Sequence, residues 1–189
     1  MAEDFRKYED HELVQMMDGS KKRSDAAFTE IYDRYASSVF AYCLKVLGGK
    51  DQAEDIFQET FIQFYNKVRA DHKNLSVRGF LITIARNLCL NYKRDKKSNV
   101  QIDEMEFLFK TYQGYEEKEM LELVRMAIEL LDEKYKEPLI LRVYNGLSYD
   151  DIANICKTSS VNARTMVFRA KQQIKKTLKP YLKDIYKEK

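Results

Sequence analysis

Apolar residues recur at three- and four-residue steps along most of this 189-residue chain. The clearest stripe consists of Phe28, Ile31, Tyr32, Tyr35, Val39, Tyr42 and Val46. Because this spacing places side chains on one face of an α-helix, it predicts a long amphipathic helix, capped by Ser24 and stopped by Gly48 and Gly49. The chain contains only two prolines and six glycines, which favours helices with short connections over a barrel or a sandwich. We therefore expect an all-α protein.

The apolar spacing divides the chain into two small helical domains joined by a flexible linker. We predict an N-terminal extension over residues 1–23 and a first domain over 24–98, built from three amphipathic helices. A second domain of four helices spans 118–182 and leaves a tail at 183–189. The intervening segment, 99–117, contains apolar residues without a sustained period, so we assign it to the linker.

Further apolar stripes mark the remaining helices of these domains. The first domain continues with a helix that begins near Asp51 and with a third helix from Phe80 to Tyr92. In the second domain the pattern resumes at Lys118, and its apolar positions are Leu121, Val124, Ile128 and Leu131. The next helix follows Asp132 and contains Pro138, which removes one amide donor and predicts a bend.

Residues 147–171 predict a helix-turn-helix. Ser148 is a good N-cap, and Asp151 can reach back to it in a pair like a capping box. The buried side of the first helix is expected to carry Tyr149, Ile152, Ala153 and Cys156. Ser159 or Ser160 caps the second helix, whose expected inward residues are Val161, Val167, Ile174 and Leu178.

The second helix of this motif is left with polar and basic residues that could contact DNA. These residues are Asn162, Arg164, Thr165, Arg169 and Lys171. Their donors suit phosphates and base edges when such a helix lies in the major groove. Two ordinary surface helices of an all-helical bundle are the alternative interpretation.

The charges are unevenly distributed, although the net charge is only +3. Nine lysines and arginines lie between Arg164 and Lys189, and seven lie between Asp71 and Lys97, each block with two acidic residues. The segment 51–60 instead holds four acidic residues and no basic one, and 103–122 is also acidic. This distribution suggests a protein that contacts nucleic acid in two places and a different partner in a third.

Several classes of function find no support in the sequence. The chain has no run of about 20 apolar residues and no signal-peptide pattern, so we expect a cytosolic protein without membrane insertion. Cys43, Cys89 and Cys156 lie far apart, which favours small buried hydrophobes over a metal site or a disulfide. Carboxylate pairs, nucleophile–base pairs and glycine-rich phosphate loops are also missing. We therefore predict no catalytic residue, no metal, no cofactor and no small-molecule substrate.

Three stretches resemble the sigma factors of bacterial RNA polymerase, specifically the extracytoplasmic-function (ECF) group. Residues 53–61 are similar to the polymerase-binding helix of that family. Residues 79–88, continuing to 92–94, resemble its promoter-melting helix. Residues 146–153, with 169–171, resemble its C-terminal helix-turn-helix. The order and spacing of the three stretches also match, and together they cover about residues 26–178.

The resemblance implies a role for each stretch. The implied polymerase-binding residues, which would dock on the clamp helices of the largest subunit, are Asp51, Glu54, Asp55, Gln58 and Glu59. The implied contacts to the minus-ten element are Arg86, Asn87, Lys93 and Arg94, with His72, Lys73 and Asn74 as readers of a flipped base in the loop 69–76. The implied contacts to the minus-thirty-five element are Ser159, Ser160, Asn162, Arg164, Thr165, Arg169 and Lys171.

The chain departs from the family pattern at a few positions. Phe80 stands where the family usually has tryptophan, and Asp132 replaces a usual proline. In the recognition helix, Arg164 preserves a basic charge while Met166 removes a common basic contact. These differences bear on the promoter sequence that is recognised rather than on the fold.

We accordingly predict a dissociable sigma factor that directs core RNA polymerase to promoters and promotes DNA melting. The expected partners are core RNA polymerase, promoter DNA as duplex and as melted single strand, and an anti-sigma factor. A stand-alone helix-turn-helix regulator is one alternative, and it would not need the acidic helix. A sigma-mimicking adaptor that titrates an anti-sigma protein is another, and the basic residues count against it. An all-helical protein-interaction module is the broadest alternative.

Overall fold

The computed structural model describes residues 4–68, 76–95 and 115–185. Every regular element within these ranges is helical, with eight α-helices and one short 3-10 helix, which confirms the predicted all-α fold. The chain divides into two compact units, Met1–Leu108 and Phe109–Lys189. The residues predicted to read a flipped base, His72, Lys73 and Asn74, and most of the predicted linker lie outside the described ranges. The finer domain boundaries stay a prediction.

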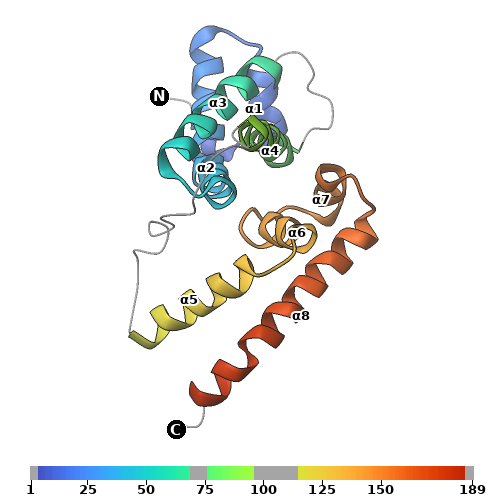
Figure 1. The fold of residues 1–189 in the computed structure, drawn as a ribbon. Helices are drawn as coiled ribbons and strands as arrows, with labels where there is room; N and C mark the ends of the chain where they lie inside the picture. The colour runs from blue at the N-terminus through green and yellow to red at the C-terminus, as the bar shows by residue number, and fades with distance from the viewer. Residues whose placement is uncertain (1–3, 69–75, 96–114, 186–189) are drawn as a thin grey trace. The chain divides into compact units, whose positions relative to one another are not determined.

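The first unit is built from a short 3-10 helix η1 and four α-helices (Figure 1). Their bounds are Phe5–Lys7 for η1, Asp10–Met16 for α1, Lys21–Leu47 for α2, Lys50–Val68 for α3 and Val77–Asp95 for α4. Helices α2, α3 and α4 pack against one another, and α1 packs against α2. Gly48 ends α2 with a φ of 78°, a backbone conformation that glycine adopts without steric cost, as the sequence predicts.

The predicted start of the long helix is wrong by one turn. Helix α2 begins at Lys21 with Ser20 as its N-cap, because residues 21–23 already continue the helical backbone. Ser24 is instead buried inside the helix, and its Oγ lies 3.5 Å from the Tyr65 hydroxyl of α3. Ser24 therefore contributes to packing between α2 and α3 rather than to capping.

Residues 10–17, expected to belong to an N-terminal extension, are anchored to α2. Leu13, Val14 and Met17 are fully or almost fully buried. Arg34 of α2 donates hydrogen bonds to Asp10 at 2.9 Å and to the carbonyl oxygen of Tyr8 at 2.8 Å. The Tyr35 hydroxyl also donates to the Asp10 carboxylate. Helix α1 is thus held by apolar burial and by a polar network together.

The interface between α2 and α3 is aromatic. Its rings are contributed by Phe28, Tyr32, Phe40, Phe57, Phe61 and Tyr65. Most pairs meet edge to face or tilted, with centroids between 4.8 and 6.2 Å, the arrangement that the ring quadrupole favours. Tyr32, predicted to face inward, is 38% exposed because it lies at the edge of this cluster.

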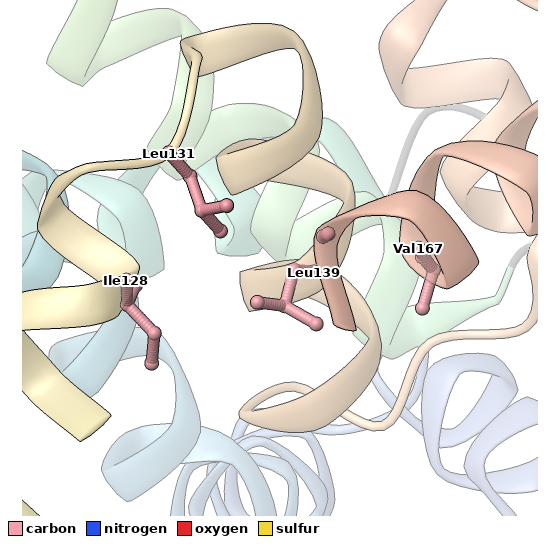
Figure 2. Close-up of a cluster of buried hydrophobic side chains, with 5 residues drawn as sticks. Ile128, Leu131, Leu139 and Val167 are labelled. Atoms are coloured by element: carbon pink, nitrogen blue, oxygen red, sulfur yellow. The ribbon is translucent and has the colours of Figure 1, made fainter. Parts of the chain in front are cut away.

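The second unit contains α5 (Tyr115–Glu129), α6 (Glu133–Val143), α7 (Tyr149–Cys156) and α8 (Ser160–Ile185). Figure 2 shows four members of its core cluster, Ile128, Leu131, Leu139 and Val167, and the cluster also includes Ala170. All four helices contribute to this cluster or reach its edge, and α8 packs against each of the other helices of the unit. Pro138 lies inside α6, as predicted, and its side chain is buried, whereas the bend expected there stays a prediction.

Two residues predicted to face the core of this unit are exposed. Leu121 is 42% exposed, because the cluster is built by the C-terminal half of α5 and Val124 already lies at its edge. Val161 is 77% exposed. The buried stripe of α8 begins with Ala163, and two residues rotate a helix by about 200°, so Val161 points away from the core.

The cysteines behave mostly as small hydrophobes. Cys43 and Cys89 are buried in the first unit, whereas Cys156 is half-buried, and all three are free thiols. A hydrogen bond with Cys89, together with burial, raises the pKa of the Cys43 thiol well above its ordinary range. Across the ranges that the structure describes, no helix combines the length and apolar character needed to cross a membrane.

Candidate protein-binding and DNA-binding surfaces

Helix α3 presents an acidic face opposite its buried stripe. Asp51, Asp55 and Gln58 are exposed and follow one another at steps of four and three residues, which places them on one side of the helix. Glu54 flanks them and lies 3.9 Å from the Lys50 ammonium, a solvent-exposed contact of small energetic value. Glu59 is half-buried and accepts a hydrogen bond from Gln63 at 2.9 Å. Helix α3 thus brings all five predicted polymerase-binding residues to one continuous side of the first unit.

An exposed apolar residue continues this acidic face. Ile62 is 56% exposed and lies four residues after Gln58, so its side chain follows the same line along α3. Ile62 was not among the residues predicted from the sequence. Its spacing of seven residues from Asp55 is the signal that could have found it.

Helix α4 carries four of the residues predicted to contact the minus-ten element. Ser76 caps the helix by accepting a hydrogen bond from the Gly79 amide at 3.1 Å. Asn87, Lys93 and Arg94 are exposed, whereas Arg86 is half-buried. Leu90, which the sequence analysis missed, is 45% exposed among them.

The two basic residues at the end of α4 also have a structural role. Lys93 and Arg94 lie in the last turn, where cations interact favourably with the helix dipole. Stabilisation of the helix end therefore explains these two cations without DNA. The DNA contact proposed for them depends on the family resemblance and on their exposure.

The predicted capping box begins the helix-turn-helix. The Ser148 Oγ accepts a hydrogen bond from the Asp151 amide at 3.0 Å, and the Asp151 carboxylate accepts from the Ser148 amide at 3.3 Å. At the other end of α7, Lys157 adopts φ 52° and ψ 52°, and the Thr158 amide donates to the Ala153 carbonyl oxygen at 2.9 Å. This closure, of the type usually made with glycine, sets the tight turn into α8.

The polar residues at the start of α8 divide into capping and exposed residues. The Ser159 Oγ accepts a hydrogen bond from the Asn162 amide at 3.2 Å, so Ser159 caps the helix, and Ser160 is its half-buried first residue. The Asn162 side-chain amide donates to the Thr158 hydroxyl at 2.6 Å. The Thr165 hydroxyl donates to the Val161 carbonyl oxygen at 2.9 Å. The side chains of Asn162 and Thr165 therefore have hydrogen-bond partners within the motif, and their DNA contacts stay a prediction.

The outward side of α8 is basic, with two apolar residues among the cations. Arg164, Arg169 and Lys171 are exposed, as predicted. Val161 and Phe168, at 77% and 59% exposure, lie seven residues apart and thus on nearly the same side. Phe168 was not predicted as a surface residue, and Val161 was predicted to face the core, because apolar residues in an amphipathic helix are ordinarily assigned to the buried stripe.

A cation–aromatic cluster links three elements beside this surface. The guanidinium carbon of Arg142, in α6, lies 4.8 Å from the centroid of the Tyr149 ring. The guanidinium carbon of Arg164, in α8, lies 5.0 Å from the same centroid. Tyr149 was predicted to be buried, and it is half-buried, with its ring available to both arginines.

Known proteins share both halves of this architecture. The family model for sigma-70 region 2 matches residues 31–99, and the model for sigma-70 region 4 matches residues 121–174. The chain is 30% identical over 152 residues to the ECF RNA polymerase sigma factor SigM of Bacillus subtilis, covering 77% of this chain and 91% of that protein. It is 27% identical to the RNA polymerase sigma-H factor of Pseudomonas aeruginosa, covering 93% of this chain and 97% of that protein.

Solved structures show the same fold. The sigma factor RpoE of Bartonella quintana, solved in complex with the anti-sigma factor NepR, matches with a TM-score of 0.66 at 21% identity, over 80% of this chain and 96% of that one. CnrH, solved in complex with the cytosolic domain of CnrY, matches with a TM-score of 0.65 at 18% identity, over 90% of this chain and 97% of that one.

The helix-turn-helix unit, the acidic helix α3 and these matches define a transcription initiation factor. The chain belongs to the ECF RNA polymerase sigma factors. It acts with RNA polymerase in promoter-directed transcription initiation.

Proposed function

We propose that the chain divides promoter-directed initiation between two helical faces of opposite charge. The acidic face of α3 would hold core RNA polymerase, and the basic side of α8 would hold the minus-thirty-five element as duplex DNA. The observation that carries the proposal is the opposite charge of the exposed residues on these two helices. Asp51 and Asp55 are exposed on α3, whereas Arg164, Arg169 and Lys171 are exposed on α8.

The α3 face suits docking on a basic protein surface. Its carboxylates are held on a rigid helix whose opposite side is buried against α2 and α4, so little order is lost when they bind. Complementary charge accelerates association and orients the partner, while Ile62 supplies apolar area that charge alone does not provide. The proposed contact residues are Asp51, Glu54, Asp55, Gln58 and Glu59, together with Ile62.

The α8 surface suits duplex DNA. In a helix-turn-helix the N-terminal residues of the second helix contact base edges in the major groove. Arg164 lies there, and an arginine can bind guanine through two hydrogen bonds. Arg169 and Lys171, further along α8, are placed to neutralise phosphates. Ser159 contributes mainly by capping the helix, while Ser160, Asn162 and Thr165 offer their remaining polar atoms.

Helix α4 would contact the minus-ten element and support melting. Asn87, Lys93 and Arg94 are exposed and Arg86 is half-buried, which gives a polar and basic side that can follow the backbone of a single strand. Leu90 among them offers an apolar contact for a base. The family resemblance assigns base capture to His72, Lys73 and Asn74.

An anti-sigma factor is a further proposed partner. The second unit exposes several large apolar side chains that its own helices leave uncovered: Leu121, Met126, Leu130, Val143 and Tyr144. Apolar side chains of this kind suit a helical protein partner. Binding of a purified candidate to the chain, and its loss in a Leu130→Asp variant, would test this contact.

The chemistry of RNA synthesis would belong to the polymerase and not to this chain, which we propose has no catalytic activity of its own. We place its action in the cytosol, where it would meet core polymerase and promoter DNA.

The test is transcription by purified bacterial core polymerase on a promoter library, with and without the chain. Specific start sites that appear only when the chain is added support the proposal, and the enriched sequences reveal both promoter elements. If start sites do not change while the chain alone binds duplex DNA, the stand-alone regulator is the better assignment.

A further inference from the structure

Two arginines from different helices lie over one tyrosine ring beside the proposed DNA surface. Arg142 approaches the ring of Tyr149 from the end of α6, and Arg164 approaches it from the second turn of α8, at 4.8 and 5.0 Å. Guanidinium groups at this distance are attracted by the negative face of an aromatic ring, and their planar shape also favours stacking. The ring thus connects Arg164, which we propose contacts DNA, with α6 and α7, the two helices that precede the recognition helix α8.

The tyrosine ring is held in place from several directions. Tyr149 packs against the core cluster formed by Ile128, Leu131, Leu139, Val167 and Ala170. As the first residue of α7, it also lies between Ser148 and Asp151, the two members of the capping box.

Arg142 is fixed on the same ring. Its Nη1 donates a hydrogen bond to the Leu147 carbonyl oxygen at 2.6 Å, which ties it to the turn that precedes α7. The platform on which Arg164 rests is therefore made by the folded core rather than by flexible surface groups.

Arg164 itself would otherwise be a long and exposed side chain with many rotamers. Ordering such a side chain when DNA binds costs conformational entropy. A guanidinium already held against a fixed ring loses less freedom on binding, and it presents its donors in fewer directions. Preorganisation of this kind favours one base geometry over others, so it affects selectivity as well as affinity.

We propose that Tyr149 is a positioning residue for Arg164. The ring orients the Arg164 guanidinium, so promoter preference at the base pair contacted by Arg164 depends on a side chain from the other helix of the motif. This inference rests on the proposed DNA contact of Arg164. Because the attraction involves the ring and not the hydroxyl group, phenylalanine at position 149 should serve almost as well.

The experiment uses holoenzyme, assembled from core polymerase and the full chain, and a promoter library randomised in the minus-thirty-five element. The variants are Arg164→Ala, Tyr149→Leu, Tyr149→Phe and the double variant Tyr149→Leu/Arg164→Ala. Tyr135→Leu is the matched control, because Tyr135 packs against the same core cluster. The cation over the Tyr135 ring is the Lys134 ammonium, at 4.8 Å from the ring centroid, rather than Arg164.

Arg164→Ala is expected to abolish selection at one base pair, which identifies the pair. Tyr149→Leu should reduce selection at that pair by about 2- to 5-fold, the range of a solvent-exposed cation–aromatic contact. Tyr149→Phe should restore selection, the double variant should resemble Arg164→Ala alone, and Tyr135→Leu should leave the preference unchanged.

The possible failures can be distinguished. If Arg164→Ala leaves promoter preference intact, the DNA contact proposed for Arg164 is wrong, and the positioning role falls with it. If Arg164→Ala removes selection but Tyr149→Leu weakens all sequences equally, or has an effect that adds to that of Arg164→Ala, then only the positioning role is overturned.

Discussion

Helices α3 and α8 follow the same construction but carry opposite charges on their outer sides. Each buries one apolar stripe against its own unit: Ala53, Phe61 and Phe64 in α3, and Ala163 and Val167 in α8. The outward residues of α3 between 51 and 59 include four carboxylates, whereas α8 holds six lysines and arginines from Arg164 to Lys179 and no acidic residue in that range.

This difference separates folding from function in the two helices. The buried stripes position each helix in its unit, and either stripe would serve for a helix of any function. The outer sides determine which partner is attracted, because carboxylates repel phosphates and attract basic protein surfaces. A sigma factor needs both properties in one chain, since it joins a polymerase to DNA.

The largest effect is expected from reversing charge on the acidic helix. Asp55→Arg should weaken association with core polymerase by about 2 kcal/mol, or about 30-fold, because it places a cation against the basic surface that we propose as its partner. Titration of labelled chain with core polymerase measures this loss. The matched control is Asp33→Arg, which reverses an exposed charge on α2. Equal losses for both variants would show that net charge, rather than the α3 face, controls binding.

A change within the first unit should alter stability without altering either charged surface. Tyr35→Phe removes the hydroxyl that donates to the Asp10 carboxylate and should lower the free energy of unfolding by about 1.5 kcal/mol. Urea unfolding measures the difference. Loss of polymerase binding under conditions where the variant is fully folded would contradict the separation of stability from function.

The same tyrosine predicts a dependence on pH. Burial, with the hydrogen bond to Asp10, raises the pKa of Tyr35 to about 12. The unfolded chain releases this proton near pH 10, so the stabilising contribution is complete below pH 10 and disappears as the pH rises toward 12. Tyr35→Phe should lack this alkaline loss, which unfolding measurements across that pH range would detect as a difference from the unaltered chain.

Removing the cap of α7 should affect the second unit alone. Ser148→Ala deletes the oxygen that accepts a hydrogen bond from the Asp151 amide, and it should lower the free energy of unfolding by about 1 kcal/mol. The control is Asp33→Asn, which changes an exposed side chain within α2 that caps no helix. If Ser148→Ala leaves thermal unfolding unchanged, the capping box contributes nothing to the helix-turn-helix.

The smallest effect is expected from one cation of α8. Lys171→Ala should weaken promoter binding by a similar factor for all sequences and lower the slope of log affinity against log salt by about 0.9. Holoenzyme affinity for duplex promoter DNA, measured at several salt concentrations, gives this slope. A sequence-dependent loss would instead show that Lys171 contacts a base.

Much of this architecture follows from local sequence patterns. The stripe of α2, the stop at Gly48 and the capping box at Ser148 each depend on neighbouring residues, and the structure confirms them. The acidic and basic faces were also predictable, because exposed charges follow helical spacing directly.

The errors arise where tertiary packing overrides the local pattern. Ser24 has the chemistry of a cap, yet it is buried because the helix begins one turn earlier. Val161 matches an inward residue by its apolar character, and only the position of Ala163 against the core shows that it faces outward. The contact of Arg142 and Arg164 with Tyr149 joins three helices, so no spacing within one helix could reveal it.

The most direct test of the central claim is site-specific crosslinking in the assembled promoter complex. A photoreactive benzoylphenylalanine replaces Ile62 on α3 in one variant and Phe168 on α8 in another, since both side chains are exposed and apolar. The account predicts that position 62 crosslinks to a polymerase subunit and position 168 crosslinks to promoter DNA. Crosslinks from position 62 to DNA, or from position 168 to polymerase alone, would contradict the division of work between the two faces.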